Sequence, residues 1–483
     1  MSAQENKAPS AGEYRIPSSS SWAGAWKIAA GVGVLGLGGA AAGWATDPKR
    51  FAYSYLFAFV VGLTLAFGSI FFVLIERLTA ASWSVSVRRT AEFFASGIWI
   101  FAILFVPVFL SMPTLYPWLS GHAESGIESS AHAQEHANEP PAPPAPVMTS
   151  QAPHGHPGGP MRPGGGPQPM PPHGFGAGPA GPAGEHAHAH ATGAHGGESP
   201  EEAAESETLH KKAPWLNKTG WIIRAVIYFA AWIWISLTFF RLSANQDGTK
   251  DPKLTVRAQQ LAPAATFLFG FTLTGAAFDW MMSLLPTWYS TIYGVTIFAG
   301  SVVCMYATLI LVTQALGEAG HLKNAVNVEH YHDLGKLLFG FLVFWAYTSF
   351  AQFMLIWYAA IPEETTFFHS RWDVGPWMWV SLAIVVLHFV VPFFILLSRN
   401  VKRRAWAVRI GAVWLIAMHV VEMYWQVMPY YAGGESTVHW IDAACLFGVA
   451  GAYLAVVFYR MTKYPLIPIG DPRLSRALSF ENA

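Results

Sequence analysis

Ten apolar runs, each long enough to cross a lipid bilayer, dominate this sequence of 483 residues. A membrane-spanning helix needs about 20 mainly apolar residues, and long unbroken runs indicate helices rather than strands. The runs cover residues 26–44, 52–75, 91–111, 219–240, 261–285, 288–316, 335–360, 376–398, 406–428 and 438–459. We therefore predict an all-α polytopic membrane protein with ten transmembrane helices.

Composition supports this prediction and excludes several other classes of protein. Only 12% of the residues are charged, whereas a soluble globular protein carries about 25%. The formal net charge is zero, so nothing indicates nucleic acid as a partner. Cys304 and Cys445 both fall inside apolar runs, which disfavours a disulfide framework or a thiolate-bound cluster.

The distribution of basic residues predicts the orientation in the membrane. Ten spans put both termini on one side, and that side carries Arg88-Arg89 and Lys402-Arg403-Arg404. The other side, apart from its long linker, has only Lys49, Arg50 and Arg371. By the positive-inside rule we expect a multi-pass protein of the bacterial inner membrane with both termini in the cytoplasm.

This topology divides the chain into five segments. Residues 1–25 form a cytoplasmic N-terminal tail, 26–119 the first three spans, 216–460 the other seven, and 461–483 a cytoplasmic C-terminal tail. Between them, residues 120–215 are rich in histidine, proline and glycine, and we expect a disordered periplasmic linker. Its HAHAH stretch suits a metal ion, although the histidines of a solvated spacer would look the same.

Ionisable residues inside or beside the spans mark candidate sites, because a charge at the centre of a span costs about 2.5–3.5 kcal/mol. On one span His419, Glu422 and Gln426 share a helix face, and on another Thr272, Asp279 and Ser283 do so. We predict a proton pathway with three parts and assign no catalytic residue. Its periplasmic half comprises Asp279, His419, Glu422, His439 and Asp442; its middle Tyr347, Ser349, Gln352 and His388; its cytoplasmic half Glu76, Glu92, His332, Asp333 and Lys336.

Each group also has a structural interpretation. Glu76 and Glu92 can pair with an arginine or cap a helix, and His332-Asp333 can simply begin one. Asp279 and the His419–Glu422 pair can be hydrogen bonds between helices. Haem is disfavoured, because His388 and His419 differ in expected depth by about 7 Å and no second pair exists. We predict no metal site.

Four stretches together carry a resemblance to a known family. They are ERLTAASWSVSVRRTAEFFA (76–95), FDWMMSLLPTWYSTIYGVTIFAG (278–300), HDLGKLLFGFLVFWAYTSFAQFMLIWYAAIPEET (332–365) and MHVVEMYWQVMP (418–429). With these the chain resembles the ActF-type subunits of bacterial alternative complex III, relatives of the NrfD/PsrC-like membrane anchors. The resemblance implies two four-helix bundles with flanking first and last helices.

The resemblance also implies a function. Such a subunit belongs to a respiratory quinol:cytochrome c (or oxidase) oxidoreductase and carries no redox centre. The implied partners are a subunit-C-like NrfD homologue, an iron–sulfur subunit, c-haem subunits and a terminal oxidase. A quinone or menaquinone pocket, bound lipids and proton translocation are expected of it.

Two other functions remain open at this stage. The chain can be a purely structural anchor whose polar residues only join helices. It can also be an independent secondary transporter, for which broken helices in matching halves would be expected. Pro392 interrupts one span, but the other half shows no corresponding break.

Overall fold

A computed structural model describes residues 12–119, 200–322, 325–373, 375–432 and 438–481. All of the regular structure in these residues is helical, and ten segments are long and apolar enough to cross a membrane. This confirms the prediction of an all-α polytopic membrane protein. The spans are Ser21–Thr46, Pro48–Leu78, Val85–Leu110, Lys218–Thr249, Pro252–Leu284, Tyr293–Glu318, Val328–Ala359, Trp377–Leu397, Ala405–Tyr431 and Trp440–Lys463.

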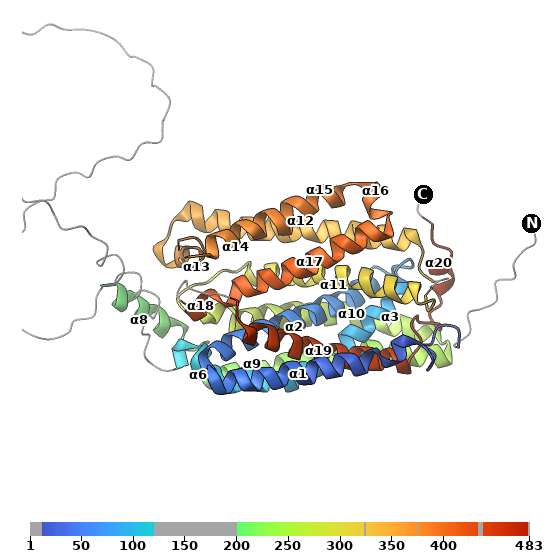
Figure 1. The fold of residues 1–483 in the computed structure, drawn as a ribbon, viewed down its shortest axis with the longest axis horizontal. Coiled ribbons are helices and arrows are strands. Elements are labelled where there is room, and N and C mark those ends of the chain that lie inside the picture. The colour runs from blue at the N-terminus through green and yellow to red at the C-terminus, as the bar shows by residue number, and fades with distance from the viewer. Residues whose placement is uncertain (1–11, 120–199, 323–324, 374, 433–437, 482–483) are drawn as a thin grey trace, which may run out of the picture.

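Eight spans form two four-helix bundles that pack side by side (Figure 1). The first bundle contains α2 (Pro48–Leu78), α3 (Val85–Ser96) with its continuation α4 (Trp99–Leu104), α9 (Lys218–Thr249) and α10 (Pro252–Trp280). The second contains α11 (Tyr293–Glu318), α12 (Val328–Ala359), α17 (Ala405–Val427) and a composite span. That span joins α14 (Trp377–Ala383), a π-helix (Ile384–Val390) and α15 (Val391–Leu397). Helices α2 and α11 contact each other and link the bundles.

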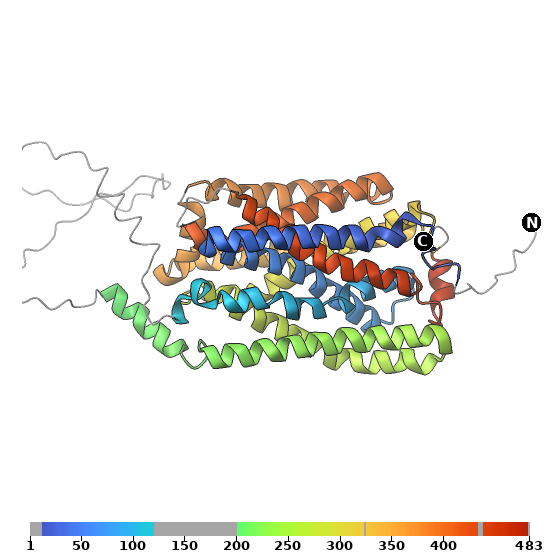
Figure 2. The same cartoon turned by 60° about the horizontal axis from the view of Figure 1, so that its bottom comes forward.

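The first and last spans, α1 (Ala25–Thr46) and α19 (Trp440–Lys463), pack along each other beside the bundles (Figure 2). A Cβ atom added at Gly36 would lie 2.3 Å from the backbone nitrogen of Gly448, and one at Gly451 would lie 2.4 Å from that of Gly33. Glycine lets the two backbones approach this closely, as small residues do between membrane helices. The Gly/Ala-rich first run is therefore a helix held by a close partner.

The molecule has two ends, which we name the terminal face and the linker face. The start of α1 and the last described helix, α20 (Leu474–Leu478), both lie at the terminal face (Figure 1). At the linker face are α5 (Val106–Leu110), α6 (Met112–Leu115), α8 (Pro200–Lys212), α13 (Pro362–Trp372) and α18 (Pro429–Ala432). The terminal face carries α16 (Arg399–Lys402) and α20 (Leu474–Leu478).

Part of the expected linker is ordered. Residues 120–199 lie outside the described residues, but α8 occupies Pro200–Lys212, so the expectation of disorder is wrong there. Glu207 and Lys211 form an i,i+4 ion pair on this helix, and Lys212 Nζ donates to the carbonyls of Pro286 (2.6 Å) and Thr287 (3.1 Å). Helix-favouring residues and this anchor on the α10–α11 loop together hold the segment.

Candidate functional site

A buried histidine–carboxylate pair lies in the second bundle. His419 and Glu422 are three residues apart on α17, and His419 Nδ1 is 3.1 Å from Glu422 Oε2. His419 is 0% exposed and Glu422 is 2% exposed. Gly300 on α11 provides the room, because a Cβ there would approach Glu422 Oε2 and His419 Cε1 to 3.3 Å. The sequence predicted this pair, and the structure brings it together.

His388 joins this pair from the composite span. Its Nδ1 lies 3.9 Å from Glu422 Oε2, and its ring stacks on the indole of Trp345 at 4.1 Å. Trp345 Nε1 donates to Glu422 Oε1 over 2.7 Å. His388 is fully buried, yet neither ring nitrogen has a hydrogen-bond partner among the described residues. We call His388, His419, Glu422 and Trp345 the Glu422 cluster.

A local break in the helix accompanies the position of His388. Pro392 lacks a backbone N–H, and its ring clashes with the carbonyl four residues earlier, which is that of His388. The segment Ile384–Val390 correspondingly winds as a π-helix, a form often found at functional sites. The structure thus brings His388, which we expected in the middle group, to the same carboxylate oxygen as His419 of the periplasmic group.

The hydrogen bonds around His419 leave one proton shared between imidazole and carboxylate. The hydroxyl of Thr64, on α2, donates to the carbonyl of Val61 over 2.9 Å. The same hydroxyl lies 2.9 Å from His419 Nε2, and which of the two atoms donates depends on the imidazole tautomer. In either tautomer the 3.1 Å contact between His419 Nδ1 and Glu422 Oε2 holds one proton. Such a shared proton is suited to transfer between neighbouring groups.

Polar side chains continue from the Glu422 cluster toward the linker face. Gln426 follows Glu422 by one helical turn, and its Oε1 accepts from the Tyr293 hydroxyl over 3.2 Å. The guanidinium of Arg371, on α13, donates to the Gln426 carbonyl over 3.0 Å. Gln352 is 7% exposed, and its Oε1 has no partner among the described residues. This side of the cluster offers steps for a proton.

Toward the terminal face, the same helices present apolar side chains. Leu334, Leu338 and Leu342 form the buried stripe of α12, and all three are fully buried. On α17 the corresponding positions are Ala412 and Leu415, also fully buried. On α12 and α17, therefore, the side of the cluster toward the terminal face is apolar.

No protein-family model and no curated protein match this chain. The resemblance to alternative complex III subunits therefore rests on the four quoted stretches alone.

Asp279 lies apart from this cluster, in the last turn of α10. Arg224 holds its carboxylate with two hydrogen bonds, Nε to Oδ2 at 2.7 Å and Nη2 to Oδ1 at 2.8 Å. Trp215 Nε1 donates to Oδ1 over 2.9 Å and the Tyr228 hydroxyl to Oδ2 over 2.8 Å. Because each carboxylate oxygen already has two donors, this geometry favours a structural tie between α9, α10 and the segment after α8.

Asp442 and His439 form a third, separate group at the start of α19. Asp442 accepts from Arg50 at 2.8 Å, Ser54 at 2.5 Å and Tyr424 at 3.1 Å. It also accepts from the backbone N–H of His439, which caps the helix. Asp279, Asp442 and Glu422 therefore do not form one continuous layer.

Glu76 and Glu92 belong to a buried ionic network near the terminal face. Arg88 donates to Glu76 at 3.1 Å, to Glu92 at 2.9 Å and to Asp471 at 2.8 Å. The network has four cations and four anions: Arg77, Arg88, Arg89 and Arg473 with Glu76, Glu92, Asp247 and Asp471. We expected Glu76 and Glu92 either to take part in a proton pathway or to pair with an arginine, and the structure shows both paired with arginines.

The remaining candidates of the predicted cytoplasmic half lie at the start of α12. Lys336 Nζ is 2.5 Å from Asp333 Oδ1, and His332 Nδ1 is 4.0 Å from the same oxygen. Nearby, Lys402 donates to the carbonyl of Leu396 over 2.7 Å. Burial and the charge of Lys336 lower the pKa of Lys402. No ion pair among the described residues joins this group to Glu76 or Glu92.

Two of the middle candidates do not line the interior. Tyr347 is 65% exposed and Ser349 is half-buried, while Trp345, Thr348 and Gln352 form the inward face of α12. A residue two positions from Trp345 points about 200° away around the helix. Grouping Tyr347 with an interior path was therefore wrong.

Several residues that complete these sites were missed from the sequence. Trp345 and Thr64 gave no signal, since an indole and a hydroxyl in an apolar run usually only pack. Arg224 gave a signal, because an arginine within a span needs a partner. Asp471 lies in the expected C-terminal tail and gave none. Among the described residues, no group of three or more His, Cys, Asp or Glu is placed to hold a metal ion.

Proposed function

We propose that this protein is a membrane subunit of a respiratory quinol:cytochrome c (or oxidase) oxidoreductase of the alternative complex III type, and that it carries protons but no redox centre. Its membrane is the bacterial inner membrane, with the terminal face in the cytoplasm and the linker face in the periplasm. Its partners are a subunit-C-like NrfD homologue, an iron–sulfur subunit, c-haem subunits and a terminal oxidase. The four family-like stretches support the assignment.

The Glu422 cluster is the observation that carries the proton role. A carboxylate and two imidazoles buried together in the membrane are costly, and such residues commonly mark proton relays. His419 and Glu422 share one proton, and His388 offers an unpartnered ring 3.9 Å from the same oxygen. A shift of about 1 Å would turn that separation into a hydrogen bond.

The surroundings of the cluster give the transfer a direction. Gln426, Tyr293 and Gln352 are buried polar groups on its linker-face side, whereas α12 and α17 present leucines on its terminal-face side. The cluster therefore exchanges protons with the linker-face solution, the side on which quinol oxidation would release them. Crossing the leucine layer requires water to enter it during turnover.

Quinol oxidation itself is assigned to another subunit. His388 and His419 are 0% exposed and Trp345 is 4% exposed, so a lipid-soluble quinone does not reach the cluster from the membrane. A quinone or menaquinone pocket in this subunit would lie elsewhere on its lipid-facing surface. This separates proton handling from electron transfer within the complex.

Replacing Glu422 with glutamine tests the proposal. The purified complex, in vesicles, should release protons upon quinol oxidation at a rate lowered by about 10², as expected when an acid–base group is removed. Thr308→Val is the control, because the Thr308 hydroxyl bonds Cys304 on its own helix (2.9 Å to the carbonyl) and, among the described residues, has no hydrogen bond to the Glu422 cluster. Proton release equal to the unaltered complex in Glu422→Gln, with full assembly, would overturn the proton role.

A purely structural anchor is the second candidate function. The saturated contacts of Asp279 and Asp442 and the balanced ionic network near α20 favour it, since these groups join helices. If this function is correct, Glu422→Gln should lower only thermal stability, and electron transfer and proton release should change together with the amount of assembled complex.

A further inference from the structure

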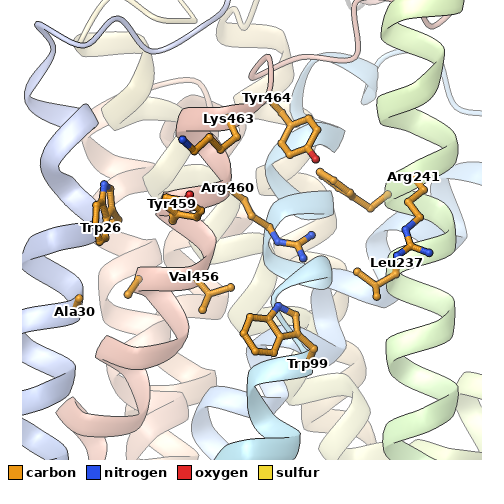
Figure 3. Close-up of a pocket in the computed structure, with 12 residues that line it drawn as sticks. Trp26, Ala30, Trp99, Leu237, Arg241, Val456, Tyr459, Arg460, Lys463 and Tyr464 are labelled. Atoms are coloured by element: carbon orange, nitrogen blue, oxygen red, sulfur yellow. The ribbon is translucent and has the colours of Figure 1, made fainter.

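A cavity of about 750 Å³ lies between α9 and α19 near the terminal face, outside both bundle interiors. Trp99, Leu237, Val456 and Ala30 form its apolar part, which lies deeper in the membrane region (Figure 3). Arg241, Arg460 and Lys463 line the part closer to the terminal face. The cavity thus combines apolar walls with a cationic rim.

Among the described residues, the cations at this rim have no ion-pair partner. No carboxylate occurs among the described residues that line the cavity, and none of the three cations forms an ion pair there. Arg460 lies over the ring of Phe240 and Lys463 over that of Tyr459, at 5.3 and 5.0 Å. Arg241 and Arg460 repel each other electrostatically. An anion between them would relieve this repulsion.

The position of the rim restricts the anion. Arg460 and Lys463 lie in the last turn of α19, where a helix reaches the headgroup region, and Trp26 and Tyr464 are aromatic residues typical of that interface. The adjoining apolar volume is large enough for the upper parts of acyl chains. Basic pockets between membrane helices are a recognised setting for acidic headgroups.

We propose that this cavity binds an anionic phospholipid, with its phosphate between Arg241 and Arg460 and its acyl chains along Trp99 and Val456. The inference does not depend on the proposed function. A free phosphate would pair with the cations but would leave the apolar walls of the cavity without a contact. A zwitterionic or neutral lipid would fill the apolar part but would leave the positive charges of the rim uncompensated.

Native mass spectrometry of the full chain, titrated with phosphatidylglycerol, tests the proposal. The double variant Arg241→Gln/Arg460→Gln should weaken binding about thirtyfold, because each basic residue near a membrane surface contributes about 1 kcal/mol. Arg399→Gln, an exposed cation on the same face, is the matched control and should bind as the unaltered protein does. Arg241→Lys/Arg460→Lys keeps the charges and should retain most of the affinity.

A second variant tests the apolar part without touching the charges. Ala455→Trp fills the cavity and should also reduce phosphatidylglycerol binding. Size-exclusion chromatography checks that the variant remains folded. Equal binding of phosphatidylcholine, tighter binding of a neutral quinone, or inorganic phosphate binding that Ala455→Trp leaves intact would each overturn the assignment. So would an unchanged affinity in Arg241→Gln/Arg460→Gln.

Discussion

Oε2 of Glu422 lies 3.1 Å from Nδ1 of His419, inside the second bundle and out of reach of solvent. The pair fits there only because α11 presents a glycine, Gly300, at the point of contact. Side chains from α2, α12 and the composite span complete the surroundings. Geometry on one helix thus depends on residues from four others.

Gly300→Ala should disturb this pair. The added methyl would lie 3.3 Å from Glu422 Oε2, and overpacking of this kind lowers stability by about 1–3 kcal/mol. Thermal unfolding in detergent measures the effect. Gly270→Ala is the control, since nothing lies within 4 Å of a Cβ there, and it should be neutral or stabilising by less than about 1 kcal/mol. Equal behaviour of the two variants would contradict the close contact.

Pro392→Ala should straighten the composite span. It restores a backbone N–H for the His388 carbonyl and gains up to about 3 kcal/mol of helix stability, while His388 turns away from Glu422. Proton release by the complex should fall although thermal stability rises. Pro263→Ala is the matched control, because Pro263 lies inside α10, away from the cluster. If proton release stays normal in Pro392→Ala, the π-helix is not needed for it.

Asp279→Asn should destabilise the protein more than it changes proton release. The substitution leaves Arg224 without its anionic partner, and we expect it to lower the free energy of unfolding by about 3 kcal/mol. This value is the lower end of the range for a broken buried ion pair, because the Arg224 side chain is 15% exposed. Chemical denaturation of single and double variants with Arg224→Gln gives the coupling free energy. A stable Asp279→Asn protein with lost proton release would return Asp279 to the proton pathway.

Docking of the C-terminal segment should weaken in acid. Burial alone would raise the pKa of Asp471, but Arg88 and Arg473 hold it well below its usual range. A carboxylate with a depressed pKa stabilises the folded state above its unfolded pKa of about 3.9, and this contribution is lost as the pH falls toward the lower folded pKa.

Hydrogen exchange of residues 464–481 measures this docking. Protection should be constant from neutral pH to about pH 4 and fall below it, and Asp471→Asn should show reduced protection already at neutral pH. A pH-independent Asp471→Asn profile would agree with the assignment. Loss of protection that is the same in both proteins between pH 4 and 3 would assign the effect to another group.

The ten spans could be predicted because apolar length is a local property of the chain. Their ends were less predictable: the fourth run was expected to end at residue 240, whereas α9 continues to Thr249. Backbone hydrogen bonds extend a helix through the polar interface, where hydropathy no longer marks it. The small residues of α1 also indicated a surface for close helix packing, but nothing in the sequence indicated that α19 would be the partner.

The candidate site was only partly readable. His419 and Glu422 were predicted as a pair because three residues along a helix place side chains together. His388 was not assigned to them, since its position depends on the π-helix before Pro392 and on how two spans cross. Asp279 and Arg224 were both visible, but nothing local indicated that α9 and α10 would bring them together.

The sequence by itself determined that this chain has ten helices long and apolar enough to cross a membrane and which helix faces carry ionisable groups, because both depend on neighbours along one helix. Only the tertiary structure decided which groups meet. It separated Glu422, Asp279 and Asp442 into three sites and assembled a four-arginine network with Asp471, because contacts between distant residues depend on the rotation and packing of whole helices.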